Sequence, residues 1–200
     1  MASSPVDIAN SALIKLGVEP ISSFTEDSKA ADRCNRQYDT IRKKTIAEHY
    51  WNFSMARATM AIVTGAPSFG FAIRYALPSD YLRAVHLNIK TARFKVEKNK
   101  YLHTNLSGAK LLYQMDVEDV SQFPPHFEEL LAINLALDLC MALTQKRTLK
   151  ADLAAERALA LRDARSTDGQ EGSMDELQAD VWIDSRISDP DGDFVYDESI

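Results

Sequence analysis

Apolar side chains recur every three or four positions near the N-terminus, the spacing typical of an amphipathic helix. The stripe consists of Val6, Ala9, Leu13 and Leu16. Ser4 is suited to cap this helix, and Pro5 fits the first helical position because that position needs no backbone N–H donor. Gly17 supplies the left-handed residue that commonly ends a helix. The pattern therefore predicts a helix from about Pro5 to Leu16.

Three further stretches carry the same helical spacing. The second helix is expected to run to about His49, on a stripe made of Ala31, Cys34, Tyr38, Ile41 and Thr45. A third opens at Pro124 and Pro125 and is apolar almost all round, which predicts packing on both sides or against another subunit. The fourth, from about Leu149 to Arg165, carries an alanine stripe that allows another helix to approach closely.

Between residues 51 and 120 the pattern changes to the alternation and punctuation typical of strands and turns. Residues 81–88 form a β-prone run, residues 94–96 and 101–103 flank a polar loop as a hairpin, and residues 111–115 alternate as a further strand. No connection of helix length separates these strands, so we expect an antiparallel meander. The predicted fold class is α+β, mainly α.

The expected organisation is a helical bundle made of residues 1–50 and 121–165, with a small antiparallel β-rich region, residues 51–120, between the two helix pairs. Residues 166–200 are expected to form an extended acidic C-terminal arm. This arm carries eleven Asp and Glu against one Arg, a net charge of −10, while residues 1–165 carry +4. A mildly basic body with an acidic arm favours docking to a partner, or masking of its own charge, over strong nucleic-acid binding.

Large apolar side chains interrupt the acidic arm. Such residues are too apolar for an inert solvated tail, and segments of this kind often become ordered on a partner. We therefore expect Trp182 and Ile183, with Phe194 and Tyr196 as a second anchor, to dock onto a partner protein or a neighbouring subunit. The alternative is that Trp182 packs back on its own domain.

The composition of the 200 residues, 46% hydrophobic and 26% charged, is that of an ordinary soluble folded chain. No apolar stretch approaches the ~20 residues that cross a bilayer, and the N-terminus lacks the basic and apolar regions of a secretory signal. We expect synthesis in the cytoplasm and no membrane partner. Cys34 and Cys140 are expected to be small core residues in a reducing compartment rather than a disulfide framework.

The sequence carries little that could perform catalysis. Glycine-rich phosphate loops, the G-x-S-x-G motif and H-E-x-x-H are all missing from it, and its four histidines are scattered. Asp189, Asp191 and Asp193 imitate the start of a calcium loop, but the glycine and the terminal glutamate of such a loop are misplaced or replaced. We therefore expect no enzyme activity, no cofactor and no metal site.

An ordered set of structural motifs runs along residues 5–165. The set comprises Lys15-Leu16-Gly17-Val18-Glu19-Pro20-Ile21, Glu26-Asp27-Ser28-Lys29-Ala30-Ala31, Cys34 with Tyr38-Asp39, Trp51-Asn52-Phe53, Arg57-Ala58, Pro67-Ser68-Phe69-Gly70, Tyr75-Ala76-Leu77-Pro78, Leu82-Arg83, and the helix from Phe123 to Ala132. In this order the set resembles the tail tubular protein A family, the head-to-tail adaptors of short-tailed bacteriophages. The specificity of the resemblance lies in the order of the whole set.

The resemblance implies a structural virion protein located in the phage tail. It implies a helical bundle with an inserted β-region, assembled as a homo-oligomeric ring of twelve subunits between the portal protein and the tail nozzle, tubular protein B. Double-stranded DNA would pass through this ring without sequence-specific binding. The acidic arm has no counterpart in the matched pattern, so the resemblance assigns it no role.

One alternative stays open, a non-enzymatic nucleic-acid-binding module that uses the basic face of the second helix. That face carries Arg36, Lys43 and Lys44, interleaved with acids.

Overall fold

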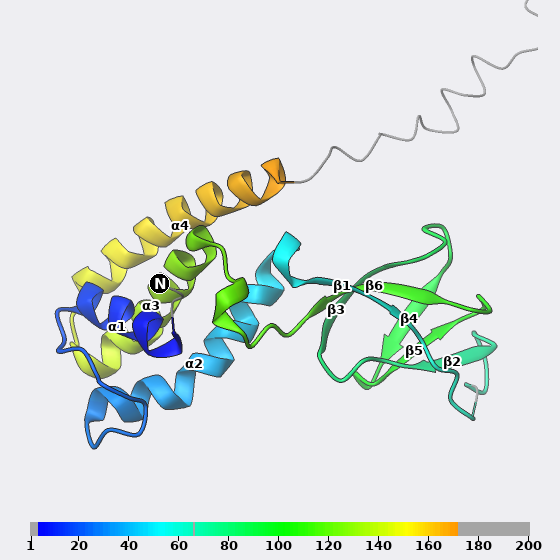
Figure 1. Ribbon diagram of the computed structural model, residues 1–200, viewed down its shortest axis with the longest axis horizontal. Helices are drawn as coiled ribbons and strands as arrows, with labels where there is room; N and C mark the ends of the chain where they lie inside the picture. The colour runs from blue at the N-terminus through cyan, green and yellow to red at the C-terminus, as the bar shows by residue number, and fades with distance from the viewer. Residues whose placement is uncertain (1–3, 66, 172–200) are drawn as a thin grey trace, which may run out of the picture.

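The computed structural model describes residues 4–65 and 67–171, which form a helical bundle and a separate β-region (Figure 1). The fold class is α+β and mainly α, as the sequence predicts. The elements in chain order are α1 (Pro5–Leu16), α2 (Lys29–Glu48), η1 (Asn52–Ser54), β1 (Met55–Thr59), β2 (Ile73–Ala76), β3 (Tyr81–Leu87), β4 (Phe94–Glu97), β5 (Tyr101–Thr104), β6 (Lys110–Met115), η2 (Val120–Gln122), α3 (Pro125–Leu143) and α4 (Arg147–Gln170).

Both ends of α1 are capped in the way the sequence predicts. The Ser4 hydroxyl accepts the backbone N–H of Asp7, and the Asp7 carboxylate accepts the backbone N–H of Ser4 at 2.9 Å. The Ser4 hydroxyl also donates to the Asp7 carboxylate at 2.7 Å, and this bond, together with that from the Ser4 backbone N–H, lowers the pKa of Asp7 because both favour its charged form. At the other end Gly17 has φ 68°, and Val18 N–H donates to the Leu13 carbonyl at 3.0 Å.

Helix α3 lies at the centre of the bundle and packs against α1, α2 and α4. Its buried residues surround the helix, and they are Phe127, Leu130, Leu131, Ala132, Ile133, Leu135, Ala136, Leu139 and Cys140. The chain's own helices therefore cover α3 on several sides. Ala164 of α4 is buried, as the predicted alanine stripe requires for close approach.

Trp51 closes the bundle where α2 ends. Its side chain is fully buried, its indole N–H donates to the Thr45 carbonyl at 3.0 Å, and its ring meets Phe127 edge-on at 5.4 Å between centroids. Phe53 and Phe123 continue this aromatic cluster around Phe127. The bundle core thus extends to the point where the chain leaves for the β-region.

The β-region consists of two three-stranded antiparallel sheets, with strand orders β1-β6-β3 and β2-β5-β4. The predicted antiparallel pairing is confirmed, including the hairpin of β4 and β5. The predicted meander is wrong, because β6 returns to pair with both β1 and β3, and β5 pairs with β2. A second core lies between the sheets and contains Met60, Tyr75, Leu87, Leu102, Ala109, Leu111 and Tyr113.

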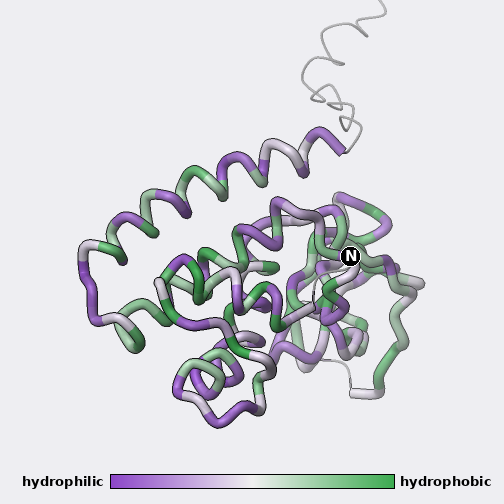
Figure 2. Tube along the Cα trace, turned by 60° about the vertical axis from the view of Figure 1, so that its left-hand side comes forward, coloured by the Kyte–Doolittle hydropathy of each residue, from purple (hydrophilic) through white to green (hydrophobic). Residues whose placement is uncertain are grey.

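Helix α4 runs along the outer edge of the bundle, where hydrophilic and hydrophobic positions alternate (Figure 2). It continues to Gln170, five residues beyond the predicted end at Arg165. The helix thus includes the first residues of the expected acidic arm, 166–170. The physical reason is Asp168, which is only 3% exposed and is held by hydrogen bonds to Asn52.

Candidate interaction site

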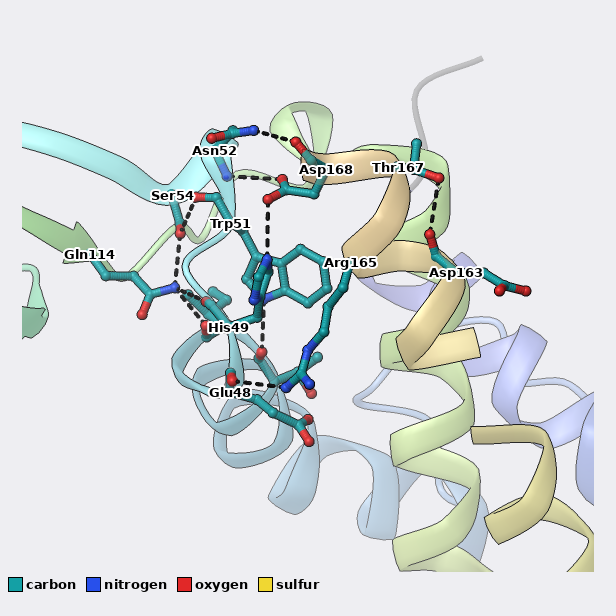
Figure 3. A network of polar contacts seen from close by, with 12 residues as sticks. Glu48, His49, Trp51, Asn52, Ser54, Gln114, Asp163, Arg165, Thr167 and Asp168 are labelled. Atoms are coloured by element: carbon teal, nitrogen blue, oxygen red, sulfur yellow. Dashed lines mark hydrogen bonds and ion pairs between the residues drawn. The ribbon is translucent and has the colours of Figure 1, made fainter. Parts of the chain in front are cut away.

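A polar network joins the bundle to the β-region where α2, η1, β6 and α4 meet (Figure 3). Gln114 lies on β6 and is fully buried. Its Nε2 lies 2.6 Å from the Ile46 carbonyl, 2.5 Å from the His49 carbonyl and 3.1 Å from Ser54 Oγ. These carbonyls belong to the end of α2, where no further helical turn supplies donors. Gln114 therefore attaches the central strand of one sheet to the end of a bundle helix.

Asp168 forms the second half of this network from the last turn of α4. Its Oδ1 accepts the backbone N–H of Asn52 at 2.9 Å, and the Asn52 amide donates to the Asp168 carbonyl at 2.6 Å. Its Oδ2 lies 3.4 Å from His49 Nε2. The C-terminal end of α4 is thereby fixed directly beside the entry to β1.

The pKa of His49 is shifted at this junction. Partial burial lowers its pKa, and this effect outweighs the opposing attraction of the Asp168 carboxylate. The guanidinium of Arg165 also lowers it, and Arg165 donates to the Glu48 carbonyl beside it at 3.3 Å. The imidazole packs edge-on against Trp51, with ring centroids 4.7 Å apart.

A second attachment lies just past the same end of β6, at residues that follow Gln114 closely in the chain. Arg42 of α2 is 2% exposed and donates to the Asp116 carboxylate at 2.5 Å and to the Val117 carbonyl. Lys43 lies 3.0 Å from the same carboxylate. Because a buried guanidinium without a partner is costly, these contacts hold α2 against the segment that leaves β6.

This arrangement changes the interpretation of the basic face of the second helix. Lys43 and Arg36 are engaged with Asp116 and Asp32 respectively, while Lys44 is exposed and lines a hollow between α2, α3 and α4. The concentrated positive charge lies elsewhere, in the β-region. Residues 55–115 carry nine Lys and Arg against two Asp and Glu, a net charge of +7. Residues 4–54 and 116–171 together carry thirteen Lys and Arg against eighteen Asp and Glu, a net charge of −5.

The hollow between α2, α3 and α4 has a volume of about 450 Å³. Arg157 spans it, with both oxygens of Glu48 at 2.6 Å from its Nη2 and the Asn134 amide oxygen at 2.6 Å from its Nε. Asn134 in turn donates to Thr45 Oγ1 at 2.9 Å. These hydrogen bonds and the ion pair of Arg157 with Glu48 brace the three helices across the hollow.

Within residues 4–65 and 67–171, His, Cys, Asp and Glu do not gather in any group of three that could hold a metal ion. No helix in the same ranges is long and apolar enough to span a membrane. Cys34 and Cys140 are buried and unpaired by disulfide, and burial raises the pKa of the Cys34 thiol to about 11. Both cysteines are core residues, as the sequence predicts.

The predicted docking residues Trp182, Ile183, Phe194 and Tyr196 lie outside the described residues. The residues of the junction, Gln114 and Asp168 above all, were missed by sequence reasoning. For Gln114 the available signal was a polar side chain between apolar neighbours on the strand, whereas Asp168 lies in a run of small and polar residues that carries no such signal. That signal is weak, because a solvated side chain on an exposed face produces the same pattern.

No protein-family model matches the chain, and a search of curated proteins finds no significant match.

Proposed function

We propose that this protein is a structural component of a short-tailed bacteriophage tail, a head-to-tail adaptor of the tail tubular protein A type. Twelve copies would form a ring between the portal protein and the tail nozzle, tubular protein B. Double-stranded DNA would pass through the ring during ejection. The subunit would act by shape, interface and charge, without a cofactor and without enzymatic activity.

The positions of the resembling motifs carry this proposal. The Leu16-Gly17-Val18 motif closes α1, and Trp51 is the fully buried residue at the exit from the bundle. Tyr75 is 1% exposed in the second core, and its hydroxyl donates to the Leu106 carbonyl at 2.9 Å. The motifs that resemble the adaptor family therefore lie at the turn after α1, at the exit from the bundle and in the core of the β-region.

The charge distribution supports the same function. An adaptor must bind two unlike partners, and electrostatic complementarity provides partner choice and orientation. A subunit with a +7 β-region and a −5 bundle presents chemically different surfaces at its two ends. The braced hollow between α2, α3 and α4 likewise favours a mechanical role over a catalytic one.

A nucleic-acid-binding module is the alternative that one observation favours. The +7 charge of the β-region, rather than α2, would supply its electrostatic surface. For a conduit, binding to short duplexes should be sequence-independent and no tighter than the ~10⁻⁴ to 10⁻⁶ M typical of non-specific complexes at physiological salt. A footprint at one defined sequence would favour the alternative and exclude the conduit.

Mixing the full-length protein with assembled cognate portal rings tests the proposal. Sedimentation should show a complex that contains both rings, and salt should weaken its formation. Trp182→Ala with Phe194→Ala should reduce the bound fraction if the acidic arm docks on the portal. Exposed Phe69→Ala is a matched aromatic control on the β-region, and it tests whether the effect is specific to the arm. Absence of any complex with full-length protein would contradict the proposal.

A further inference from the structure

The outer face of the β1-β6-β3 sheet carries a shallow groove of about 220 Å³. Directly opposed residues in antiparallel strands project to the same side, so Arg57, Leu112 and His86 form one row across the three strands. Thr59 and Lys110 form the next row between β1 and β6. The groove thus combines half-buried Leu112 as its floor with cationic side chains at its edge.

The cationic side chains at the edge of the groove are exposed to solvent and are not part of the core. Arg57 and Lys110 are both exposed, whereas Leu111, which projects to the opposite side of the same sheet, is 1% exposed in the second core. The surface is therefore built for a ligand with an apolar part that enters the groove and acidic groups that remain at its edge. A phosphodiester backbone offers acidic groups alone and would leave the apolar floor unused.

The chain contains a segment with this chemistry. Residues 172–200 carry nine Asp and Glu against one Arg, a net charge of −8. The acids flank the large apolar residues directly, in the runs Asp180-Val181-Trp182-Ile183-Asp184 and Asp193-Phe194-Val195-Tyr196-Asp197. Its net charge is close in size and opposite in sign to that of the β-region.

The segment also begins close to the groove. Asp168 is hydrogen-bonded to Asn52, and Arg57 follows Asn52 by only five residues, at most about 18 Å of extended chain. Trp182 follows Glu171 by eleven residues, which can extend about 36 Å. A tethered segment of this length has an effective concentration near the millimolar range, so even weak docking within one molecule is populated.

We propose that residues 172–200 dock in the same molecule onto the groove of the β1-β6-β3 sheet, with Trp182 over Leu112 and the flanking acids at Arg57 and Lys110. In the isolated chain the acidic segment then covers part of the basic surface, and a partner must displace it to reach that surface. The inference concerns the isolated chain and does not rest on the proposed function. Its test contains no portal protein, so the two can fail separately.

Trp182 fluorescence in the full-length protein provides the test. Trp51 is fully buried, and subtracting the spectrum of a Trp182→Phe variant isolates the signal of Trp182. Docking predicts blue-shifted emission and acrylamide quenching several-fold weaker than for a synthetic peptide of residues 172–200. In the variant with Arg57→Glu and Lys110→Glu, quenching should rise toward the value of the free peptide. Circular dichroism would verify that this exposed-site variant keeps its helices.

The matched control is Lys95→Glu with Lys98→Glu. It changes the net charge by the same amount but lies on β4 and the following turn, in the other sheet. This control should leave Trp182 shielded. Equal release by both variants would reduce the effect to diffuse attraction and overturn the proposal, as would peptide-like quenching in the unmodified chain.

The same assay separates the other occupants. Docking within one molecule predicts shielding that is independent of protein concentration, and shielding that grows with concentration would assign the groove to a second copy instead. Even when no ligand is added, the docked segment should slow the acylation of Lys110. If only a short DNA duplex slows it, the face is a nucleic-acid surface and the proposal is wrong.

Discussion

The two bodies of this protein are stabilised in different ways. The bundle buries a central helix on several sides, with the aromatic cluster of Phe127, Phe53 and Phe123 at one end. The β-region has a smaller core between two short sheets and leaves many cationic side chains in solvent. A positively charged body of this kind repels itself, and it is attached to the bundle through Gln114, Asp168 and Arg42. The comparison leads us to expect that the β-region is less stable than the bundle.

Phe127→Ala should have the largest effect. The residue is fully buried and contacts Trp51, Phe53 and Phe123, so truncation leaves a cavity that the packed aromatic rings cannot fill. We expect a loss of about 3–5 kcal/mol in the free energy of unfolding. Urea denaturation followed by circular dichroism measures it. Phe69→Ala, at an 87% exposed residue, should stay within about 0.5 kcal/mol and serves as the control.

Leu102→Ala should destabilise the β-region more selectively. Leu102 is fully buried on β5 in the second core, and its truncation should cost about 2–5 kcal/mol locally. Native-state hydrogen exchange should show lost protection in β2, β4 and β5 while α3 retains its own. Equal loss of protection in α3 would mean that the two bodies unfold as one unit, and the comparison would be wrong.

Asp168→Ala tests the attachment itself. The change leaves the Asn52 N–H without its acceptor, which should cost about 1–3 kcal/mol and loosen the last turn of α4. Hydrogen exchange of residues 165–171 should accelerate before that of α3. Asp163→Ala is the matched control on the same helix, because that side chain is 69% exposed. A control with the same effect would show that α4 charge, rather than the junction, is responsible.

The smallest expected effect is a pH dependence that arises at His49. Its pKa is lowered in the folded state, so the unfolded chain binds more protons as the pH falls below the ordinary value of about 6.5. Stability from this group is therefore complete above that pH, decreases through the window below it, and levels off below the folded pKa. His49→Gln should flatten the slope of the urea midpoint between pH 7.5 and pH 5. Identical slopes would exclude this contribution.

The local structure of the bundle could be predicted because its signals are local. Ser4, Pro5 and Gly17 define α1 through capping chemistry, and the nearly continuous apolar surface of α3 identifies the central helix. The hairpin of β4 and β5 could be predicted for the same reason, since the polar turn lies between two short runs that pair with each other.

The remaining features depend on partners far apart in the sequence. Strand β1 reads Met-Ala-Arg-Ala-Thr, which has little β signature, and it forms because β6 pairs with it more than fifty residues later. Asp168 lies in a run of small and polar residues that resembles a helix end, yet Asn52 holds it in α4. The +7 charge of residues 55–115 was concealed because the predicted region, residues 51–120, also includes Asp116, Glu118 and Asp119 and so carries only +4.

Electron microscopy of the full-length protein mixed with its cognate portal protein tests the adaptor proposal most directly. The account predicts a twelve-membered ring seated coaxially on the portal, with an open central channel wide enough for double-stranded DNA. A protein that stays monomeric beside unoccupied portal rings, or that decorates DNA instead of the portal, would contradict it.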